Sequence, residues 1–256
     1  MGLKYLLGAG AAILFGAAAL VGASSAQEKG EFDAAKKEEI RKIIKDYLIE
    51  QPEVLQEALE ILQKRVAEKT EKEQKAARAE HLAPLFKAAT PYSYGDGKVT
   101  VVEFFDYNCP YCGKAFEELG AFAKENKDVR LVLIEFPILS KESLIASQAA
   151  IAAVKQNKYW EYHQALMQHR GRKTQDTIFQ TAKDIGLDVE KLKADMQSPE
   201  VEALITKNRT LADAIGVEAT PYVFVGDKVI AGAPEDFKSQ LDAAVAEVRA
   251  KGCSIC

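Results

Sequence analysis

The stretch that most constrains this chain is residues 99–116, VTVVEFFDYNCPYCGKAF. It opens with β-branched and aromatic residues, a composition typical of a buried strand. Residues 106–108 (Asp-Tyr-Asn) break that run and Cys109-Pro110-Tyr111-Cys112 follows. Apolar Phe116 and Leu119 then recur three residues apart, which indicates a helix. We therefore predict a strand, a short turn and a helix that begins at the cysteine pair.

Two cysteines three apart in the first turn of a helix can close a small disulfide ring. Cys109 would lie where unpaired backbone N–H groups and the helix dipole stabilise a thiolate. A stabilised thiolate is both a nucleophile and a good leaving group, so the pair exchanges disulfides readily. Pro110 has no N–H to donate and its fixed φ suits the first helical position. Cys112 is expected to be the resolving thiol, buried one turn further and neutral until it reacts.

Two other interpretations of the pair compete with redox chemistry. A zinc site needs a second pair, and none follows at the usual distance of about 15 to 20 residues. The other two cysteines, Cys253 and Cys256, lie at the far end of the sequence. A purely structural disulfide usually joins distant segments. The strand-then-helix context favours redox chemistry for Cys109 and Cys112.

Residues 102–112, VEFFDYNCPYC, resemble the active-site segment of the DsbA-like thioredoxin-fold proteins of the bacterial periplasm. Residues 219–225, ATPYVFV, resemble the cis-proline loop and following strand of that fold. The two segments are about 110 residues apart, and DsbA-like proteins carry a helical insertion between them. The resemblance implies an α/β thioredoxin fold with a helical insertion, preceded here by an α-helical segment.

Glu103 is the one acid inside the predicted strand, where an unpaired carboxylate is costly unless it is protonated. The DsbA-like motif has an acid at the matching place, beneath the disulfide, where it helps to move the proton of the buried thiol. The alternative is a strand-end glutamate that reaches solvent. Strong oxidants of the family have histidine where this chain has Tyr111. Tyrosine cannot stabilise the thiolate as imidazolium does, so we expect a less acidic Cys109 and a less oxidising disulfide.

The Thr220-Pro221 bond is of the only type that adopts cis at low cost. In thioredoxin-like proteins this loop faces the cysteine pair and pairs with a bound peptide through backbone groups. We therefore expect Thr220 and Pro221 to contact substrate, together with Pro110 and Tyr111. The alternative is that Pro221 merely starts an edge strand.

The first 26 residues read as a secretory signal, with Lys4, an apolar stretch and small residues before a cleavage point after Ala26. An uncleaved membrane anchor is the alternative. Export places the protein in the periplasm, where disulfides persist. Removing the signal deletes one positive charge and no acid, so the net charge goes from −4 to −5 and gives no reason to expect nucleic-acid binding.

Residues 27–80 have the composition of a helical stalk. Leu55, Leu59, Leu62 and Val66 form a heptad-like seam, and residues 67–80 turn polar, as in a solvated stalk. The segment resembles the amino-terminal domain of the ScsC-type (suppressor of copper sensitivity) and Com1-like branch, which mediates self-association. We expect a homo-oligomer, for which the resemblance implies a trimer; an arm folded onto the catalytic domain is the alternative.

The remaining boundaries follow from breaks in pattern: a linker at 81–97, a DsbA-like thioredoxin domain at 98–251 with its helical insertion at about 140–217, and a Cys-x-x-Cys tail at 252–256. Tyr159, Trp160 and Tyr162 are expected to fill core, and His163 to be a structural histidine. The tail is open to several roles: its own disulfide, electron transfer to the active site, Cu(I) binding, or none.

We expect thiol–disulfide exchange on exported proteins that contain cysteines, without a dissociable cofactor or a metal. An oligomeric isomerase or reductase would need a membrane reductase of the ScsB or DsbD kind. The alternative is a disulfide-donating oxidase, reoxidised by a DsbB-like membrane enzyme. A copper-binding protein is a further alternative of another class, although the sequence holds only three Met and three His.

Overall fold

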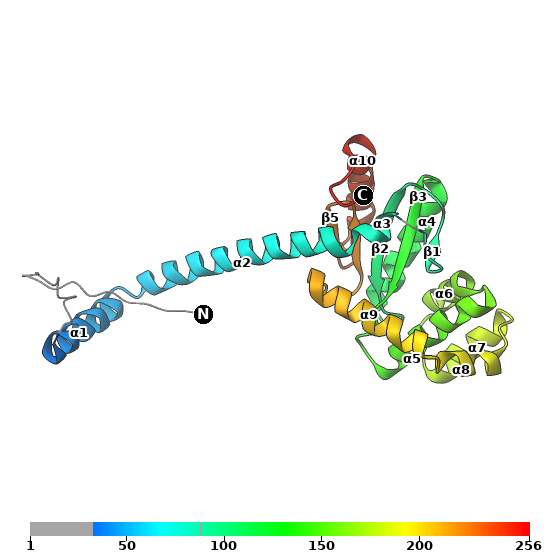
Figure 1. The fold of residues 1–256 in the computed structure, drawn as a ribbon, viewed down its shortest axis with the longest axis horizontal. Coiled ribbons are helices and arrows are strands. Elements are labelled where there is room, and N and C mark those ends of the chain that lie inside the picture. Colours follow the sequence, from blue (N-terminus) through cyan, green and yellow to red (C-terminus); the bar gives the residue numbers. More distant parts are fainter. Residues whose placement is uncertain (1–32, 88) are drawn as a thin grey trace, which may run out of the picture. The chain divides into compact units, whose positions relative to one another are not determined.

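The computed structural model describes residues 33–87 and 89–256, and the expected signal lies outside them. The chain divides into two compact units, Met1–Leu62 and Gln63–Cys256. None of the described helices is long and apolar enough to cross a membrane. Figure 1 labels the elements of both units.

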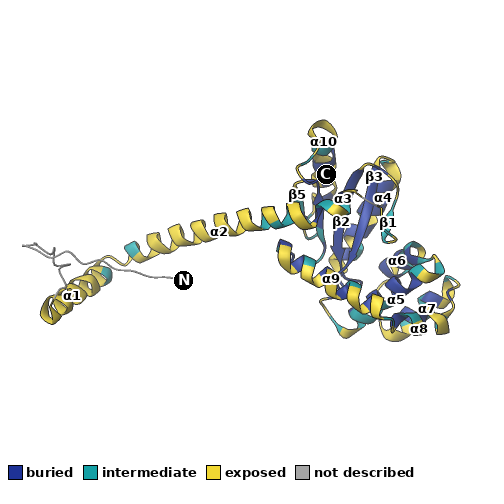
Figure 2. Cartoon of the chain, in the orientation of Figure 1, coloured by how far each residue is buried: buried dark blue, intermediate teal, exposed yellow. Residues whose placement is uncertain are grey.

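The helical segment contains α1 (Ala34–Glu50) and α2 (Glu53–His81), separated at Gln51 and Pro52. Asp33 caps α1 by accepting a hydrogen bond from the Lys36 N–H at 2.8 Å. Neither helix contains a buried residue, and most residues of both helices are exposed (Figure 2). Ile43, for example, is 60% exposed.

The last turns of α2 differ from the expected solvated stalk. Gln74, Ala77 and Arg78 are half-buried. Ala77 packs against the core that contains Phe86, because its small side chain allows close approach. Arg78 donates hydrogen bonds to Gln74 at 2.9 Å and to Glu71 at 3.4 Å, which hold its guanidinium at this boundary.

The second unit is built on a five-stranded sheet with the order β1-β3-β2-β4-β5. The strands are β1 (Ser93–Tyr94), β2 (Val99–Phe105), β3 (Val129–Glu135), β4 (Tyr222–Val225) and β5 (Lys228–Ala231). The β2–β3 pair is parallel and the other pairs are antiparallel. Every residue of β2 and β3 is buried, as expected for near-continuous apolar strands covered on both faces.

Helices cover both faces of the sheet. One face packs on α4 (Pro110–Glu125) and α10 (Phe237–Lys251), and the other on α3 (Ala83–Lys87) and α9 (Pro199–Ile215). Alternation along β2 sends Val101 and Phe105 toward the α4 side and Val102 and Phe104 toward the α9 side.

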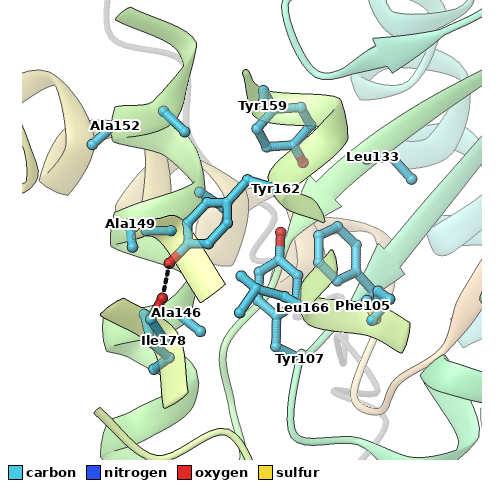
Figure 3. Packing of buried hydrophobic residues seen from close by; sticks show 14 of the residues in the cluster. Phe105, Tyr107, Leu133, Ala146, Ala149, Ala152, Tyr159, Tyr162, Leu166 and Ile178 are labelled. Atoms are coloured by element: carbon cyan, nitrogen blue, oxygen red, sulfur yellow. Dashed lines mark hydrogen bonds between the residues drawn. The ribbon is translucent and has the colours of Figure 1, made fainter. Parts of the chain in front are cut away.

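The helical insertion comprises α5 (Lys141–Ala153), the short 3₁₀ helix η1 (Val154–Gln156), α6 (Tyr159–Gln168), α7 (Gln175–Asp184), α8 (Val189–Met196) and α9. Its core joins the carboxyl end of β2, where Phe105 and Tyr107 pack among side chains of α5 and α6 (Figure 3). The Tyr162 hydroxyl donates a hydrogen bond to the Ile178 carbonyl at 2.6 Å. Tyr159 and Tyr162 are buried and Trp160 is half-buried, so these aromatics fill core as expected.

Residues 81–97 were expected to form a linker but contain α3 and β1. Leu82 and Phe86 are buried against the sheet, and the Tyr94 ring stacks on Trp160 with centroids 4.1 Å apart. Burial removes these apolar and aromatic side chains from water and so stabilises the fold, whereas a solvated linker would leave them exposed.

The carboxyl-terminal tail packs on the domain and is closed by a Cys253–Cys256 disulfide, one of the roles that the sequence left open. Ile255 is buried in the core that contains Phe224. The Ser254 N–H donates to Asp227 Oδ2 at 2.8 Å, and the Ser254 hydroxyl contacts the same carboxylate. The tail is therefore anchored to the β4–β5 turn.

Candidate active site

Cys109 is the N-cap residue of α4, and Pro110 occupies the first helical position. The Cys109 carbonyl accepts hydrogen bonds from the N–H groups of Cys112 at 3.2 Å and Gly113 at 3.3 Å. Both thiols are free in this structure. Cys109 retains 6% exposure, whereas Cys112 is fully buried. The predicted strand, turn and helix are all present, and they leave a small part of Cys109 exposed while Cys112 is buried completely.

The surroundings of the two thiols lower the pKa of Cys109 and raise the pKa of Cys112. The hydrogen bond from Cys112, with smaller contributions from the N–H groups of Cys112 and Tyr111, lowers the pKa of Cys109 to about 6 against the opposing effect of desolvation. Burial raises the pKa of Cys112 far above its ordinary value, and the hydrogen bond to Cys109 raises it further. At neutral pH the pair therefore holds one thiolate and one thiol.

Glu103 lies on the face of β2 that α4 covers, because its position alternates with Val102 and Phe104. It is 2% exposed, so it is not a strand-end glutamate that reaches solvent. Burial, and then the negative charge of Cys109, raises the pKa of Glu103 to about 8. Its Oε1 has no hydrogen-bond partner in the described part of the chain. A protonated carboxyl thus sits beside the cysteine pair.

The Thr220–Pro221 peptide bond is cis, and its loop faces Cys109. The Cys109 thiol donates a hydrogen bond to the Thr220 carbonyl at 3.3 Å. The Pro221 carbonyl accepts from the Gly232 N–H at 2.8 Å, which ties the loop to the end of β5. Tyr111 is 64% exposed and Pro110 is exposed, so both face outward from the start of α4.

Two polar residues that the sequence analysis did not single out hold the cysteine loop in place. The Asp106 carboxylate accepts hydrogen bonds from the N–H groups of Asn108 at 2.7 Å, Ile138 at 2.9 Å and Leu139 at 3.0 Å. Asn108 binds the backbone of Lys173, accepting from its N–H at 2.7 Å and donating to its carbonyl at 3.4 Å. Asp and Asn directly after a strand are a signal for such local hydrogen bonding, although their partners could not be read from it.

A second buried carboxyl, Glu135, was also missed. It accepts hydrogen bonds from the hydroxyls of Tyr107 and Tyr159, each at 3.0 Å, and burial raises its pKa to about 8. The Tyr107 hydroxyl also hydrogen-bonds His163 Nδ1 at 3.1 Å. Burial lowers the pKa of His163 to about 3, so it is a neutral core residue, as expected. An acid within an apolar strand was the available signal, the same one that had drawn attention to Glu103.

A cavity of about 800 Å³ opens beside Cys109, between the start of α4 and the loop that follows α6. Its lining includes Asn108, Pro110 and Met167 together with several basic side chains. Within residues 33–87 and 89–256, no three His, Cys, Asp or Glu side chains gather where they could hold a metal ion.

An acidic thiol at a helix N-terminus, a buried partner thiol, a neighbouring buried acid and a cis-proline loop define a thiol–disulfide oxidoreductase. The chain belongs to the thioredoxin family, whose model matches residues 87–243. A second model, described as the copper resistance protein ScsC N-terminal domain, matches residues 37–69. These matches confirm the expected fold, resemblance and enzyme class: a thioredoxin-fold thiol–disulfide oxidoreductase of the ScsC and DsbA kind.

Similar proteins of known structure span much of the chain. A thioredoxin-like oxidoreductase from Silicibacter pomeroyi is 42% identical with a TM-score of 0.59, covering 62% of this chain and 91% of that one. Proteus mirabilis ScsC, in a transitional conformation, is 28% identical with a TM-score of 0.60, covering 86% of this chain and 100% of that one.

The curated relatives match between 51% and 64% of the chain. The chain spans about a fifth of the length (21%) of the first of them, a Na⁺/H⁺ antiporter, at 28% identity over 135 residues. A probable disulfide bond formation protein D from Bacillus cereus is 28% identical over 180 residues, which cover 64% of this chain and 82% of that protein.

Proposed function

We propose that this protein is a periplasmic, oligomeric disulfide isomerase or reductase that acts on exported proteins with cysteines. The observation that carries the proposal is the row of exposed apolar side chains on α1 and α2. Ile43, Ile44, Leu59 and Leu62 are each more than half exposed. A helix that leaves such a stripe in water gains stability by packing it against a partner, and the match of residues 37–69 to the ScsC N-terminal domain supports another copy of the chain as that partner.

The chemistry begins at Cys109. Its thiolate attacks one sulfur of a substrate disulfide, a Cys109–substrate bond forms, and the other substrate sulfur leaves as a thiolate. In isomerisation that thiolate, or another substrate thiolate, later attacks the mixed disulfide and frees Cys109. In reduction Cys112 attacks Cys109 Sγ, the substrate leaves as a second thiolate, and the pair is oxidised to a disulfide.

Glu103 would assist the reductive branch, because Cys112 must lose its proton before it attacks. The carboxyl is buried on the same side of β2 as the pair and has one oxygen without a partner among the described residues. Once Cys109 is bonded to substrate it carries no charge, so one of the two causes that raise the pKa of Glu103 is removed. Glu103 then ionises more readily and accepts the Cys112 proton.

The Thr220 carbonyl would bind the peptide once Cys109 has lost its proton. In the protonated form of Cys109 the carbonyl accepts the thiol hydrogen bond. Neither the thiolate nor the sulfur of a mixed disulfide has a proton to donate, so the carbonyl is then available to a backbone N–H of the bound peptide. Pro221 holds the loop at this position, and the exposed Pro110 and Tyr111 would border the same peptide.

A membrane reductase of the ScsB or DsbD kind would return two electrons to the Cys109–Cys112 disulfide after each reduction. Tyr111 supports this direction over disulfide donation, because a tyrosine adds no cation beside the thiolate. A DsbB-like oxidase would be the partner if the protein instead donated disulfides.

The redox state of Cys109–Cys112 in cells tests the direction. Acid quenching and thiol alkylation would be done in a Cys253→Ser/Cys256→Ser background, so that only the active-site pair is counted, with Cys109→Ser/Cys112→Ser as the blank. A mostly reduced pair is expected. A mostly oxidised pair would assign the protein as a disulfide-donating oxidase.

Sedimentation of the purified protein tests the oligomer. Wild-type protein is expected to sediment as an oligomer, and Ile43→Lys/Leu59→Lys as a monomer with the exchange chemistry of its Cys109 intact. Matched exposed polar substitutions on the same helices, Lys42→Glu/Glu60→Lys, serve as the control. A monomeric wild type would refute the self-association.

A further inference from the structure

The cavity beside Cys109 is lined mainly by basic charge. We define the basic groove as Lys114 on α4 and His169, Arg170, Arg172 and Lys173 in the segment after α6. Glu117 is the one acidic residue in the same lining. This concentration contrasts with the whole chain, whose net charge is −4.

Hydrogen bonds hold residues of the basic groove next to Cys109. Asn108, the neighbour of Cys109, binds both backbone groups of Lys173, which fixes the 169–173 segment beside the cysteine loop. The Lys114 ammonium donates a hydrogen bond to the Ala233 carbonyl at 3.4 Å, in the segment after β5. The basic side chains therefore border the path by which a peptide reaches Cys109.

Much of this charge is not neutralised within the protein. Arg172 pairs with Glu142 at 2.9 Å, and Glu117 offsets one further cation. Arg170 and Lys114 form no ion pair with any residue that the structure describes, and Arg170 is exposed. Lys173 is only 7% exposed, and burial lowers its pKa while Asp106 and the two active-site thiols raise it. A cation that lies this close to the thiolate also repels a basic substrate segment.

We propose that the basic groove makes this enzyme selective for protein segments that carry carboxylates next to the reacting cysteine. The proposal rests on the proposed function and adds its substrate class. Opposite charges in a partly enclosed cleft raise the local concentration of the substrate and its rate of association, by about 10-fold or more at low salt. Segments flanked by lysine or arginine would be disfavoured by the same field.

The test uses two synthetic peptides, each closed by one internal disulfide. They are identical except that the reacting cysteine is flanked by aspartates in one and by lysines in the other. Reduced wild-type protein is mixed with each, and the rate of peptide reduction is measured by acid quench and mass spectrometry. Two electrons pass from Cys109 and Cys112 to the peptide disulfide, so each event gives one protein disulfide and one peptide dithiol. The reverse reaction, oxidised protein with the dithiol peptides, is measured as well.

The expected wild-type preference for the aspartate peptide is about 10-fold at low salt, falling toward 2-fold at high salt as charges are screened. Arg170→Gln/Arg172→Gln is expected to bring the ratio near one, and Arg170→Glu/Arg172→Glu to invert it. The matched control for the Arg170→Glu/Arg172→Glu variant is Lys124→Glu/Lys127→Glu, which changes the net charge by the same amount at and just beyond the C-terminal end of α4. It should keep the wild-type ratio within 2-fold.

The other outcomes contradict the proposal, the function on which it rests, or both. Equal wild-type rates for the two peptides would refute the selectivity. Loss of the ratio in Lys124→Glu/Lys127→Glu would also refute it, because the preference would then depend on net charge alone. A preference seen only in the oxidising direction would keep the acidic substrate class but refute the reductive function. Failure of the wild type with both peptides in both directions would refute the groove and the proposed function together.

Discussion

The chain carries two Cys-x-x-Cys pairs with the same spacing and opposite placements. Cys109 caps the N-terminus of α4, whereas Cys253 follows the C-terminus of α10, which ends at Lys251. The first pair consists of free thiols and the second is a disulfide. Aligned peptide dipoles make a helix N-terminus partly positive and a C-terminus partly negative, so a thiolate is favoured at the first site and disfavoured at the second.

Comparison of the two pairs shows that the Cys-x-x-Cys spacing determines only whether a small disulfide ring can form. Reactivity comes from what surrounds the ring. The first pair has the Thr220 carbonyl, the buried Glu103 and an open cavity. The second encloses Ile255, which is buried in a core, and its neighbour Ser254 is tied to Asp227. The surroundings of Cys109 and Cys112 suit thiol–disulfide exchange, whereas those of Cys253 and Cys256 suit attachment of the tail to the domain.

The largest expected effect is on the rate of disulfide reduction, and it distinguishes the two Cys-x-x-Cys pairs. Cys109→Ser should lower the rate of insulin reduction by roughly 1000-fold or more, because no other described thiol is both acidic and accessible. Cys253→Ser/Cys256→Ser should stay within 2-fold of wild type. A loss of 10-fold or more in the tail variant would mean that the second pair passes electrons to the first.

A smaller effect is expected from the acid beneath the first pair. Glu103→Gln should slow the attack of Cys112 on a preformed mixed disulfide by about 100-fold, the usual contribution of a positioned base. The wild-type rate should rise with pH as Glu103 ionises, and this step should be missing in the variant. Single-turnover release of a peptide thiol measures it. Glu135→Gln is the matched control, since Glu135 is equally buried but belongs to the Tyr107–Tyr159 network.

The acidity of the first pair is checked by titrating thiolate absorbance in the reduced protein. One thiolate should appear with a midpoint of about 6, absent in Cys109→Ser, and Cys112 should stay silent through pH 9. Folding lowers the pKa of Cys109 from about 9, so this thiol contributes stability that is gained as pH rises from 6 to 9 and lost as pH falls through 6. Glu103 and Glu135, whose pKa values are raised to about 8, act in the opposite sense, so the Cys109 contribution is measured as the difference in unfolding free energy between wild type and Cys109→Ser. A difference that does not change with pH across that range would contradict the assigned acidity.

Changes in the Cys253–Cys256 tail are expected to have the smallest effect on catalysis but a measurable effect on the free energy of unfolding. Removing the short Cys253–Cys256 loop should lower the free energy of unfolding by about 2 kcal/mol, the loop-entropy value for such a ring. Ile255→Ala, with the disulfide intact, should cost about 2 kcal/mol through lost burial. Urea unfolding measures both. Unchanged midpoints in both variants would show that the tail contributes nothing to the fold.

Local pattern was enough to predict the central strand, the helix that starts at the cysteine pair and the helical character of the amino-terminal segment, whereas the helical insertion was implied by the resemblance to DsbA-like proteins. These features depend on neighbouring residues, as in the continuous apolar run of β2 and the proline at the start of α4. Glu103 was found because an acid in a core strand is unusual, and the Thr220–Pro221 loop because residues 219–225 resemble the cis-proline loop of the thioredoxin fold.

Contacts between distant segments could not be predicted in the same way. The Asn108–Lys173 clamp joins residues 65 apart, and the basic groove depends on it. Residues 81–97 looked like a linker because their prolines and glycines outweigh Leu82 and Phe86 in composition, while in three dimensions those two side chains find a core. Glu135 stood out in the sequence only as an acid within an apolar strand, and its partners, Tyr107 and Tyr159, are brought to it by the fold.

The register of β2 sets a limit on how this protein can vary in evolution. The strand is paired on both sides, with Glu103 opposite Leu133 of β3 and Val223 of β4. A one-residue insertion before Glu103 would turn the carboxyl to the α9 face and bring an apolar side chain beneath the cysteines. Length changes should therefore accumulate in the insertion loops and the β4–β5 turn, whereas a deletion scan across Val99–Phe105 should tolerate none.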